Sequence, residues 1–317
     1  MGFFPIESAS SSPSRPSSIQ WEECACLLCG SQYWKPLLEA PDALQGESGL
    51  WFAVVQCQNC GLCYTNPRPD AGSIQHFYPA SYRPHQTSEP RRQRKWKLTK
   101  PWRGARKERH FLTWHGQGRL LDFGCGGGSF LRRVHDQGWQ VTGIDVSSDA
   151  VARIRAEFGL HALVGSLPHE ELSPESFDVI TMWHVLEHVH EPLRILREAQ
   201  RLLVPGGHLY VAVPNIDSLP FRWFKQYWFG LDLPRHLTHF TPPSLQLMLE
   251  HAHFRVGPIH MIRHTEWLRR SALRACQQPR HPYWFRWLRH RPIAGLATCY
   301  ASAIGQADSM LVRCVKE

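Results

Sequence analysis

Residues 119–131 read RLLDFGCGGGSFL, and this stretch decides the fold. A short apolar run leads into glycines at alternate positions, Gly124, Gly126 and Gly128, and an apolar pattern with helical spacing follows them. The pattern predicts a strand, a glycine-rich loop and a helix, with backbone N–H groups and the positive end of the helix facing a ligand. A P-loop is excluded because no Gly-Lys-Ser/Thr follows. A dinucleotide fingerprint is excluded because Ser129 stands where a final glycine or alanine is required.

Expected strands and helices alternate along the rest of the chain. We predict further strands over residues 140–144, 162–164, 177–181, 208–213, 254–262 and 309–315, and helices that begin near Ser148 and cover 192–203. Such alternation predicts a parallel sheet with helices on both faces. The expected fold class is therefore α/β, with a Rossmann-like, seven-stranded, doubly wound and mostly parallel sheet.

An acid ends the second predicted strand of this sheet. Asp145 stands where a carboxylate accepts hydrogen bonds from a ribose diol. It could instead cap the next helix, but Ser147, Ser148 and Asp149 can each fill that role. Asp145 is therefore available to bind a nucleoside.

Two C-x-x-C motifs precede the predicted sheet. Cys26 and Cys29 form the first, Cys57 and Cys60 form the second, and a glycine follows each motif. Four thiolates complete a closed tetrahedral zinc shell, which is structural rather than catalytic, and glycine permits a left-handed turn after each pair. The apolar residues between the motifs suit a small β-ribbon: Trp34, Leu37, Leu38, Trp51, Phe52, Val54 and Val55. The sequence therefore predicts a zinc-ribbon-like segment before the α/β sheet.

The other cysteines leave alternatives open. Cys24 or Cys63 could replace one of the four ligands, and the thiols of both motifs could instead be buried and free. Residues 1–18 contain neither a basic start nor a long apolar run, so we expect no secretory signal, a cytoplasmic location and reduced thiols. Ordinary small apolar roles are expected for Cys125, Cys276, Cys299 and Cys314.

The positive charge of the chain is unevenly distributed. The formal net charge is +9, yet residues 83–109 carry eleven Lys or Arg against two acids, and residues 255–317 carry eleven against three. The remainder of the chain is acidic, which disfavours a protein coated uniformly for nucleic acid. Both basic segments contain several aromatic residues, a mixture that is typical either of contact with an anionic membrane surface or of solvated helices. No apolar run approaches the roughly 18–20 residues of a membrane span.

These patterns divide the chain into four parts. They are a disordered tail (1–20), the zinc-ribbon-like segment (21–69), a basic helical linker (70–116) and a sheet domain (117–317) with insertions at 215–241 and 263–302. The first insertion is rich in aromatic residues. It is interpreted as a lid over a substrate, with a packed helical embellishment as the alternative. The second insertion is either an interfacial amphipathic element or a basic helical hairpin.

The motifs in this order resemble the class I S-adenosylmethionine-dependent methyltransferases. The resemblance covers residues 117–262 and rests on LLDFGCGGGSFL, VTGIDVS and FDVITMWHVLEHVHEPLRILREAQRLLVPGGHLYVAVPN. The cysteine motifs, TNPRP and LDLPRHLTHFTPPSL are similar to a bacterial subgroup with an N-terminal zinc-ribbon segment. That subgroup is related to the ubiquinone-biosynthesis type of O-methyltransferase. The resemblance implies S-adenosylmethionine as cofactor, beside the structural Zn²⁺ predicted from the cysteines.

The resemblance also implies which residues bind the cofactor. Asp122 and the three loop glycines correspond to the positions that hold its methionine end, and Asp145 corresponds to the ribose-binding acid. Ser166 occupies a position where many relatives present an acid to the adenine. Trp183 and His184 correspond to positions beside the sulfonium, where an aromatic face is physically sensible.

Methyl transfer to oxygen or nitrogen also needs an aligned acceptor and, in many cases, a general base. His188 and His236 are the candidate catalytic bases, because histidine titrates near neutral pH. Arg235 and His239 are the candidate substrate-binding residues, since arginine suits an anionic group such as a phosphate. Each histidine has an alternative role in packing or capping.

The expected function is transfer of a methyl group from S-adenosylmethionine to a small-molecule acceptor. O-methylation of a sugar, a quinone-like compound or a lipid-linked cell-surface precursor is predicted, with peripheral contact at an anionic membrane surface as a further hypothesis. An RNA methyltransferase is the first alternative, because zinc segments and basic patches also occur in RNA-modifying enzymes. A non-catalytic binding protein is the second alternative, and the intact glycine loop and Asp145 argue against it.

Overall fold

The computed structural model describes residues 19–42, 49–78, 118–278 and 281–317. Most of the predicted disordered tail and most of the predicted basic linker lie outside these residues. The chain forms two compact units. One, which we call the sheet unit, contains residues 79–214, 242–262 and 309–317. The other, which we call the ribbon unit, contains residues 1–78, 215–241 and 263–308.

A seven-stranded sheet forms the centre of the sheet unit, in the order β12-β13-β10-β9-β6-β7-β8. All described neighbours pair in parallel except β13, which is antiparallel to both β10 and β12. The strands are β6 (Arg119–Phe123), β7 (Gln140–Asp145), β8 (His161–Val164), β9 (Phe177–Trp183), β10 (Leu203–Pro214), β12 (Phe254–Ile262) and β13 (Ser309–Lys316). This arrangement confirms the predicted doubly wound, mostly parallel sheet.

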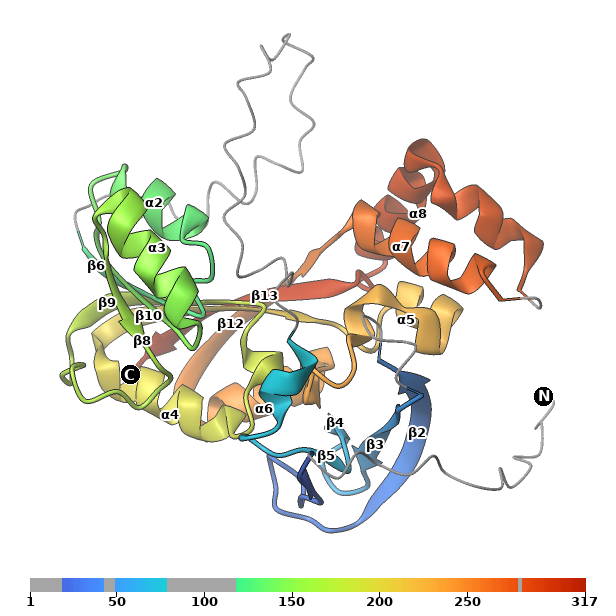
Figure 1. Ribbon diagram of the computed structural model, residues 1–317, viewed down its shortest axis with the longest axis horizontal. Coiled ribbons are helices and arrows are strands. Elements are labelled where there is room, and N and C mark those ends of the chain that lie inside the picture. Colours follow the sequence, from blue (N-terminus) through green and yellow to red (C-terminus); the bar gives the residue numbers. More distant parts are fainter. Residues whose placement is uncertain (1–18, 43–48, 79–117, 279–280) are drawn as a thin grey trace, which may run out of the picture. The chain divides into compact units, whose positions relative to one another are not determined.

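Helices cover both faces of this sheet (Figure 1). They are α2 (Ser129–His135), α3 (Ser148–Phe158), α4 (Pro192–Leu202) and α6 (Pro242–His251), with the short 3₁₀ helix η4 (Leu186–His188) after β9. The Ser147 hydroxyl caps α3 by accepting a hydrogen bond from the Ala150 N–H, so Asp145 is not needed as the cap. Proline at the first position of α4 suits a helix start, where no N–H is required.

The ribbon unit contains a four-stranded antiparallel sheet in the order β11-β4-β3-β2. Its strands are β2 (Trp34–Pro41), β3 (Trp51–Cys57), β4 (Cys63–Thr65) and β11 (Thr238–His239). The predicted β-ribbon is confirmed as the β2–β3 pair. Strand β11 comes from the first insertion, so the cysteine-rich segment does not form its sheet alone. A second, two-stranded sheet pairs β1 (Trp21–Glu22) with β5 (Arg68–Pro69), and the 3₁₀ helix η2 (Ile74–Phe77) follows.

Both insertions supply helices to the ribbon unit. The first contributes α5 (Leu219–Phe224), η5 (Lys225–Tyr227) and η6 (Phe229–Leu231). The second contributes α7 (Thr265–Cys276), η7 (Tyr283–Arg289) and α8 (Arg291–Ala303). No helix among the described residues is long and apolar enough to cross a membrane.

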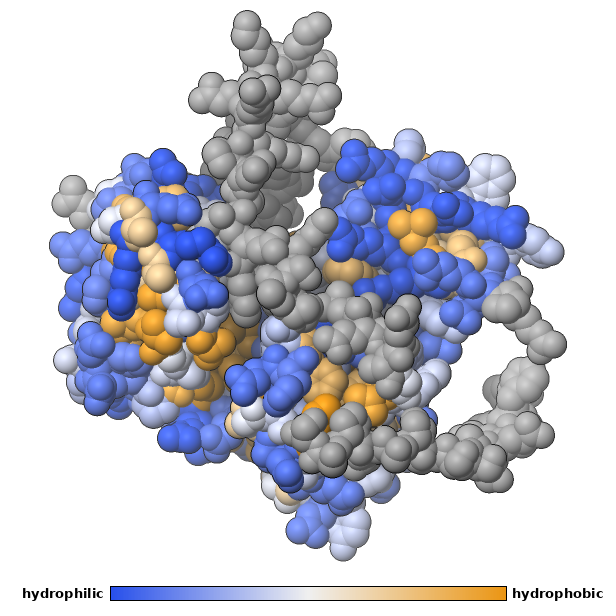
Figure 2. All heavy atoms as spheres, viewed as in Figure 1, coloured by the Kyte–Doolittle hydropathy of each residue, from blue (hydrophilic) through white to orange (hydrophobic). Residues whose placement is uncertain are grey.

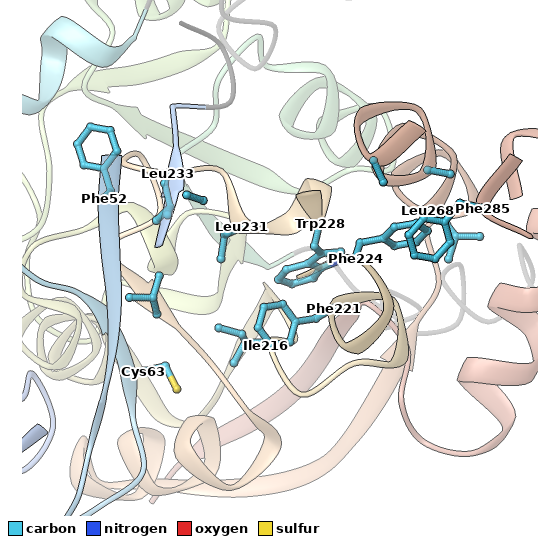
Figure 3. Packing of buried hydrophobic residues seen from close by; sticks show 14 of the residues in the cluster. Phe52, Cys63, Ile216, Phe221, Phe224, Trp228, Leu231, Leu233, Leu268 and Phe285 are labelled. Atoms are coloured by element: carbon cyan, nitrogen blue, oxygen red, sulfur yellow. The ribbon is translucent and has the colours of Figure 1, made fainter. Parts of the chain in front are cut away.

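The aromatic residues of the first insertion form a hydrophobic core and not a lid. Phe221, Phe224 and Trp228 are buried, and they belong to the same cluster as Phe52 and Phe285 (Figure 3). Phe224 and Phe285 lie with ring centroids 4.6 Å apart. The cluster therefore joins three segments that are distant in sequence, and the interpretation of the first insertion as a substrate lid is wrong.

Candidate cofactor site and cysteine cluster

Asp145 and the glycine-rich loop are joined by hydrogen bonds. The Asp145 Oδ2 accepts from the Gly126 N–H at 2.8 Å, and its Oδ1 accepts from the Ser147 N–H at 2.9 Å. The Gly124 N–H donates to the Ile144 carbonyl at 2.8 Å. These contacts hold the loop after β6 against the end of β7. Asp145 is 6% exposed, and its carboxylate keeps acceptor capacity for a ligand because each oxygen has two lone pairs.

Two loop glycines are required by close approach as well as by backbone conformation. Gly124 has φ +73°, and a Cβ there would lie 2.5 Å from Val185 Cγ2. Gly128 has φ +70°, and a Cβ there would lie 2.6 Å from Ile154 Cγ1. Side chains would therefore strain the backbone and clash with the elements that pack on the loop.

Asp122 is buried beneath this loop. Its Oδ1 accepts a hydrogen bond of 2.7 Å from the Thr181 hydroxyl, and the two residues are paired in the register of β6 and β9. Burial raises the pKa of Asp122 to about 7, the Thr181 hydrogen bond opposes this rise, and the nearby Asp145 adds to it. Thr181 was not among the predicted site residues, although a hydroxyl in the otherwise apolar strand pattern was a signal for it.

We expect the pKa of Asp122 to appear as a pH dependence of stability. Its pKa is about 7 in the folded chain and 3.8 in the reference state. The folded chain therefore retains a proton that the unfolded chain loses, so stability falls as the pH rises from about 4 to about 7. Asp122→Asn should remove this penalty, on the order of a few kcal/mol, because one pKa unit corresponds to about 1.4 kcal/mol.

Denaturant unfolding of the ligand-free protein at pH 5 and pH 8 measures this effect. The stabilisation of Asp122→Asn over the wild type should be larger at pH 8. Asp149→Asn, which changes an exposed acid of the same unit, should keep the wild-type difference between the two pH values. Equal effects of Asp122→Asn at both pH values would contradict the assignment.

The end of β9 places an aromatic side chain and two polar ones close together. Trp183 packs edge-on against Phe130, with ring centroids 5.4 Å apart, and its Nε1 has no hydrogen-bond partner among the described residues. His184 adopts φ +53°, and its N–H donates to the Ala212 carbonyl. The ring Nδ1 of His184 lies 3.3 Å from Oε1 of Glu187.

Glu187 is, like Thr181, a site residue outside the predicted set. It is fully buried in η4, and neither carboxylate oxygen accepts a hydrogen bond of good geometry from the described residues. A buried carboxylate beside a histidine ring can orient that ring and balance a cation. No local pattern distinguishes it from a solvent-facing glutamate. The next residue, the candidate base His188, is half-buried, and its backbone N–H donates to the Val185 carbonyl.

Ser166 follows β8 after a turn that begins at Gly165. The Gly165 N–H donates to the Asp145 carbonyl at 2.9 Å, and Gly165 adopts φ +142°. Ser166 is half-buried next to this turn. The sheet unit therefore brings together the carboxyl ends of β6, β7, β8 and β9, the edge at which sheets of this kind bind ligands.

In the ribbon unit, four cysteines converge on one point. The Sγ atoms of Cys26, Cys29, Cys57 and Cys60 all lie within 4.8 Å of one another. The Cys26–Cys60 and Cys29–Cys57 pairs are separated by 3.4 and 3.6 Å. A tetrahedral shell with Zn–S bonds of about 2.3 Å has S–S edges of about 3.8 Å. The four thiols are therefore positioned to bind a metal ion, and an all-sulfur tetrahedral set favours zinc.

The two cysteine turns have the same backbone pattern. The Gly30 N–H donates to the Cys26 carbonyl, and the Gly61 N–H donates to the Cys57 carbonyl. Both glycines have positive φ, +72° and +76°. The structure also decides between the alternative ligands, because Cys24 and Cys63 are outside the cluster.

Comparison with known proteins agrees with this geometry. A model of the methyltransferase domain family matches residues 85–257, which is more than half of the chain. The chain belongs to this methyltransferase domain family. The match includes the glycine loop, Asp145 and the end of β9. The predicted resemblance to S-adenosylmethionine-dependent methyltransferases with an N-terminal zinc-ribbon-like segment is thereby confirmed.

The curated relatives include ubiquinone biosynthesis O-methyltransferases. This chain is 33% identical over 130 residues to the protein from Aliivibrio fischeri strain MJ11, and the match covers 39% of this chain and 53% of that protein. For the protein from Xanthomonas oryzae pv. oryzae, the identity is 33% over 172 residues, with 49% and 70% covered. The chain spans about half the length of the first of these relatives.

A solved structure shows the same fold. It is a complex that contains the Haloferax volcanii Trm112 methyltransferase activator. The TM-score is 0.50 at 20% identity, with 68% of this chain and 89% of that chain covered.

Arg235 is buried and forms ion pairs with two aspartates. Its guanidinium donates to Oδ1 of Asp42 at 2.9 Å, to both carboxylate oxygens of Asp232, and to the carbonyls of Phe77 and Leu233. Burial alone would lower the pKa of Arg235, but the two aspartates raise it. The side chain is 0% exposed. The structure therefore corrects the predicted role of Arg235 as a substrate anchor, because its donors are used within the ribbon unit.

We expect Arg235→Gln to destabilise the ribbon unit strongly. Removal of one partner of a buried ion pair costs about 3–5 kcal/mol, because the other charge stays buried without compensation. Arg222→Gln is the matched control, since Arg222 and Asp217 form an exposed pair at 2.8 Å, and its loss should cost under about 1 kcal/mol. Denaturant unfolding checks both values, and similar losses for the two variants would count against a structural role.

The two other predicted residues of this segment are also largely buried. His239 Nε2 lies 3.1 Å from the Thr65 hydroxyl, which donates to the His236 carbonyl. The His239 ring therefore donates to Thr65, and burial lowers the pKa of His239 to about 3. This corrects the predicted substrate contact to a structural link between β11 and β4. His236 donates from Nδ1 to the Gly230 carbonyl at 3.0 Å.

Proposed function

We propose that this chain transfers a methyl group from S-adenosylmethionine to a hydroxyl group of a small-molecule acceptor. The observation that carries the proposal is the contact of the Asp145 carboxylate with the loop N–H of Gly126, next to the buried Asp122. The named relatives are O-methyltransferases of ubiquinone biosynthesis, which favours oxygen as the methylated atom.

The residues of the sheet unit fit the parts of this cofactor. S-adenosylmethionine supplies a methyl group activated by a positive sulfur. In our proposal Asp145 accepts hydrogen bonds from the ribose hydroxyls, and Ser166 lies toward the adenine. Asp122 and the loop at Gly124, Gly126 and Gly128 hold the amino-acid end. An ammonium beside Asp122 would favour its ionised form and offset the effect of burial.

The end of β9 aligns the reacting groups. The Trp183 ring offers an aromatic face to the sulfonium, and Glu187 orients His184 beside it. His188 is proposed as the general base that takes the acceptor hydroxyl proton, with His236 as the second candidate. The main contributions of the protein are alignment and exclusion of water, because the methyl group is already activated.

Methyl-labelled S-adenosylmethionine tests the proposal directly. The protein is incubated with separate lipid, sugar-nucleotide, RNA and protein fractions of cells, and Asp145→Asn is the inactive control. Label in the lipid or sugar-nucleotide fraction with the wild type alone is the expected result. Label in RNA or protein would overturn the proposed acceptor class. Failure of S-adenosylhomocysteine to raise the melting temperature would overturn the cofactor assignment itself.

A further inference from the structure

The second insertion exposes an apolar surface in the ribbon unit. We call it the η7–α8 surface and define it by its exposed side chains: Tyr283, Trp284, Trp287, Leu296, Tyr300 and Ile304. Leu296 is 69% exposed and Trp287 is 63% exposed. Figure 2 shows apolar atoms surrounded by hydrophilic residues in the region of α7 and α8. Several large exposed apolar residues within two consecutive elements indicate an interaction site.

Helix α8 is apolar on its exposed side as well as on its buried side. Ala294, Thr298 and Ala301 are buried, whereas Leu296 and Tyr300 project from another face, one turn apart. The chain contains no charged residue between positions 291 and 308. A helix that meets only water normally carries charged or polar residues on its outer face. The outer face of α8 is therefore suited to an apolar environment.

The preceding η7 presents aromatic and cationic side chains together. Phe285 and Leu288 are buried in the ribbon unit, while Tyr283, Arg286 and Trp287 are exposed. The guanidinium of Arg286 lies 5.6 Å from the centre of the Tyr283 ring. Tyrosine and tryptophan are the side chains that favour the boundary between water and lipid, because each has an apolar body and a polar tip.

The charge on this surface is positive and is not balanced by acids. Residues 263–308 contain eight Arg against Glu266 and Asp308. Glu266 is paired with two arginines of α7, and Asp308 is buried. The exposed Arg286, Arg289 and Arg291 form no ion pair with a carboxylate of the described residues. They are therefore available to an anionic partner.

We propose that the η7–α8 surface docks the protein onto an anionic lipid membrane. Arginines contact lipid phosphates, the aromatic residues lie at the headgroup level, and the apolar face of α8 enters the acyl-chain boundary. At about 1.5 Å per residue, the helix is about 20 Å long, which suits a helix lying in the interface plane.

The charge and chemistry of the surface disfavour the other occupants. A second copy related by a two-fold axis would bring the same arginines together with no acids to pair with them. Single-stranded RNA would use the cations and the aromatic rings, but the aliphatic Leu296 and Ile304 provide neither stacking nor hydrogen bonds for bases. A lipid boundary uses all three kinds of side chain.

Vesicle co-sedimentation of the full chain tests this proposal without cofactor or acceptor. Its outcome is therefore independent of the proposed methyl transfer. We expect binding to phosphatidylcholine vesicles that contain phosphatidylglycerol, little binding to phosphatidylcholine alone, and loss of binding at high salt. Hydrogen exchange on the bound protein should show new protection over residues 283–304. Absence of binding to the anionic vesicles at low salt overturns the proposal.

Two surface variants and one control variant test whether binding uses this surface and not exposed aromatic residues in general. Tyr283→Ser with Trp287→Ser removes two exposed aromatic side chains from the surface and should lower vesicle affinity by roughly tenfold or more. Tyr33→Ser with Trp51→Ser removes two exposed aromatic side chains from the cysteine-rich segment and should leave affinity unchanged. Arg286→Gln with Arg289→Gln should lower affinity by roughly tenfold and flatten the salt dependence.

Three further outcomes would refute membrane docking by this surface. One is equal vesicle binding by the Tyr283→Ser with Trp287→Ser variant and the control. Another is a dimer in light scattering that the surface variant abolishes. The third is preferential binding of RNA over anionic vesicles. If a surface variant does not fold, the hydrogen-exchange map of the unchanged chain decides the question, because protection elsewhere excludes the η7–α8 surface.

Discussion

Replacing Cys60 by serine should release the metal and strongly destabilise the ribbon unit. A structural zinc in small peptides contributes roughly 10–16 kcal/mol of apparent binding free energy, which becomes folding free energy. Cys60 supplies one of four converging thiols, and its turn follows directly from β3. Bound zinc should fall from about one ion per chain to near zero. The first thermal transition should fall by about 10 °C or more.

Cys24→Ser is the matched control for the metal prediction. Cys24 is half-buried in the same segment and outside the cluster. The Cys24→Ser protein should keep its zinc and melt within a few degrees of the wild type. Metal analysis and thermal unfolding, with and without a chelator, measure both effects. A wild-type protein that lacks zinc and melts unchanged with chelator would show that the cluster is not a metal site.

Gly124→Ala should abolish most cofactor binding. A Cβ at this position would lie 2.5 Å from Val185 Cγ2, and the residue has φ +73°. The loop must move to relieve both effects, and its N–H groups then leave the positions fixed by Asp145 and Ile144. We expect a loss of affinity for S-adenosylhomocysteine on the order of a hundredfold, because each lost hydrogen bond to a charged group costs about 1.5–3 kcal/mol.

Gly159→Ala is the control for Gly124→Ala, because it introduces backbone strain at a positive φ without a steric clash. Gly159 ends α3 with φ +63°, and a Cβ there would have nothing within 4 Å. Its substitution should cost about 1 kcal/mol of stability and leave cofactor affinity unchanged. Calorimetric titration with S-adenosylhomocysteine compares the two variants. Equal affinities for Gly124→Ala and the wild type would exclude the loop as the binding site.

The sheet unit was predictable because its signals are local. Each predicted strand is an apolar run that the structure contains, with shifts of a residue or two at most ends. The largest shift is in β10, which begins at Leu203 and not at the predicted 208. Leu203 pairs with Phe177 before an irregularity that ends at His208. Proline and two glycines in this stretch indicate a turn by pattern, whereas the strand accommodates them as a bulge.

The errors were concentrated in the ribbon unit. The side chains at 221, 224 and 228 indicate only that this segment buries aromatic surface, and they do not indicate against what. From the sequence, Arg235 and its neighbouring histidines suggest an anion-binding site. In the structure, Arg235 pairs with Asp42, which is 193 residues away in the sequence. The role of His239 was also not predictable, because its partner Thr65 is 174 residues away in the sequence. Local sequence patterns do not reveal partners that are so far apart in the sequence.

Sequence alone determined the α/β sheet, the glycine loop with Asp145, and the four-cysteine cluster. Each depends on short motifs or runs that are visible in the sequence, where sterics and ligand geometry restrict the choices. Only the tertiary structure decided that three distant segments build the ribbon unit, that Glu187 is buried, and that Arg235 is paired. Burial and ion pairing depend on which surfaces come into contact when the chain folds. Local sequence patterns do not specify contacts between residues that are far apart in the chain.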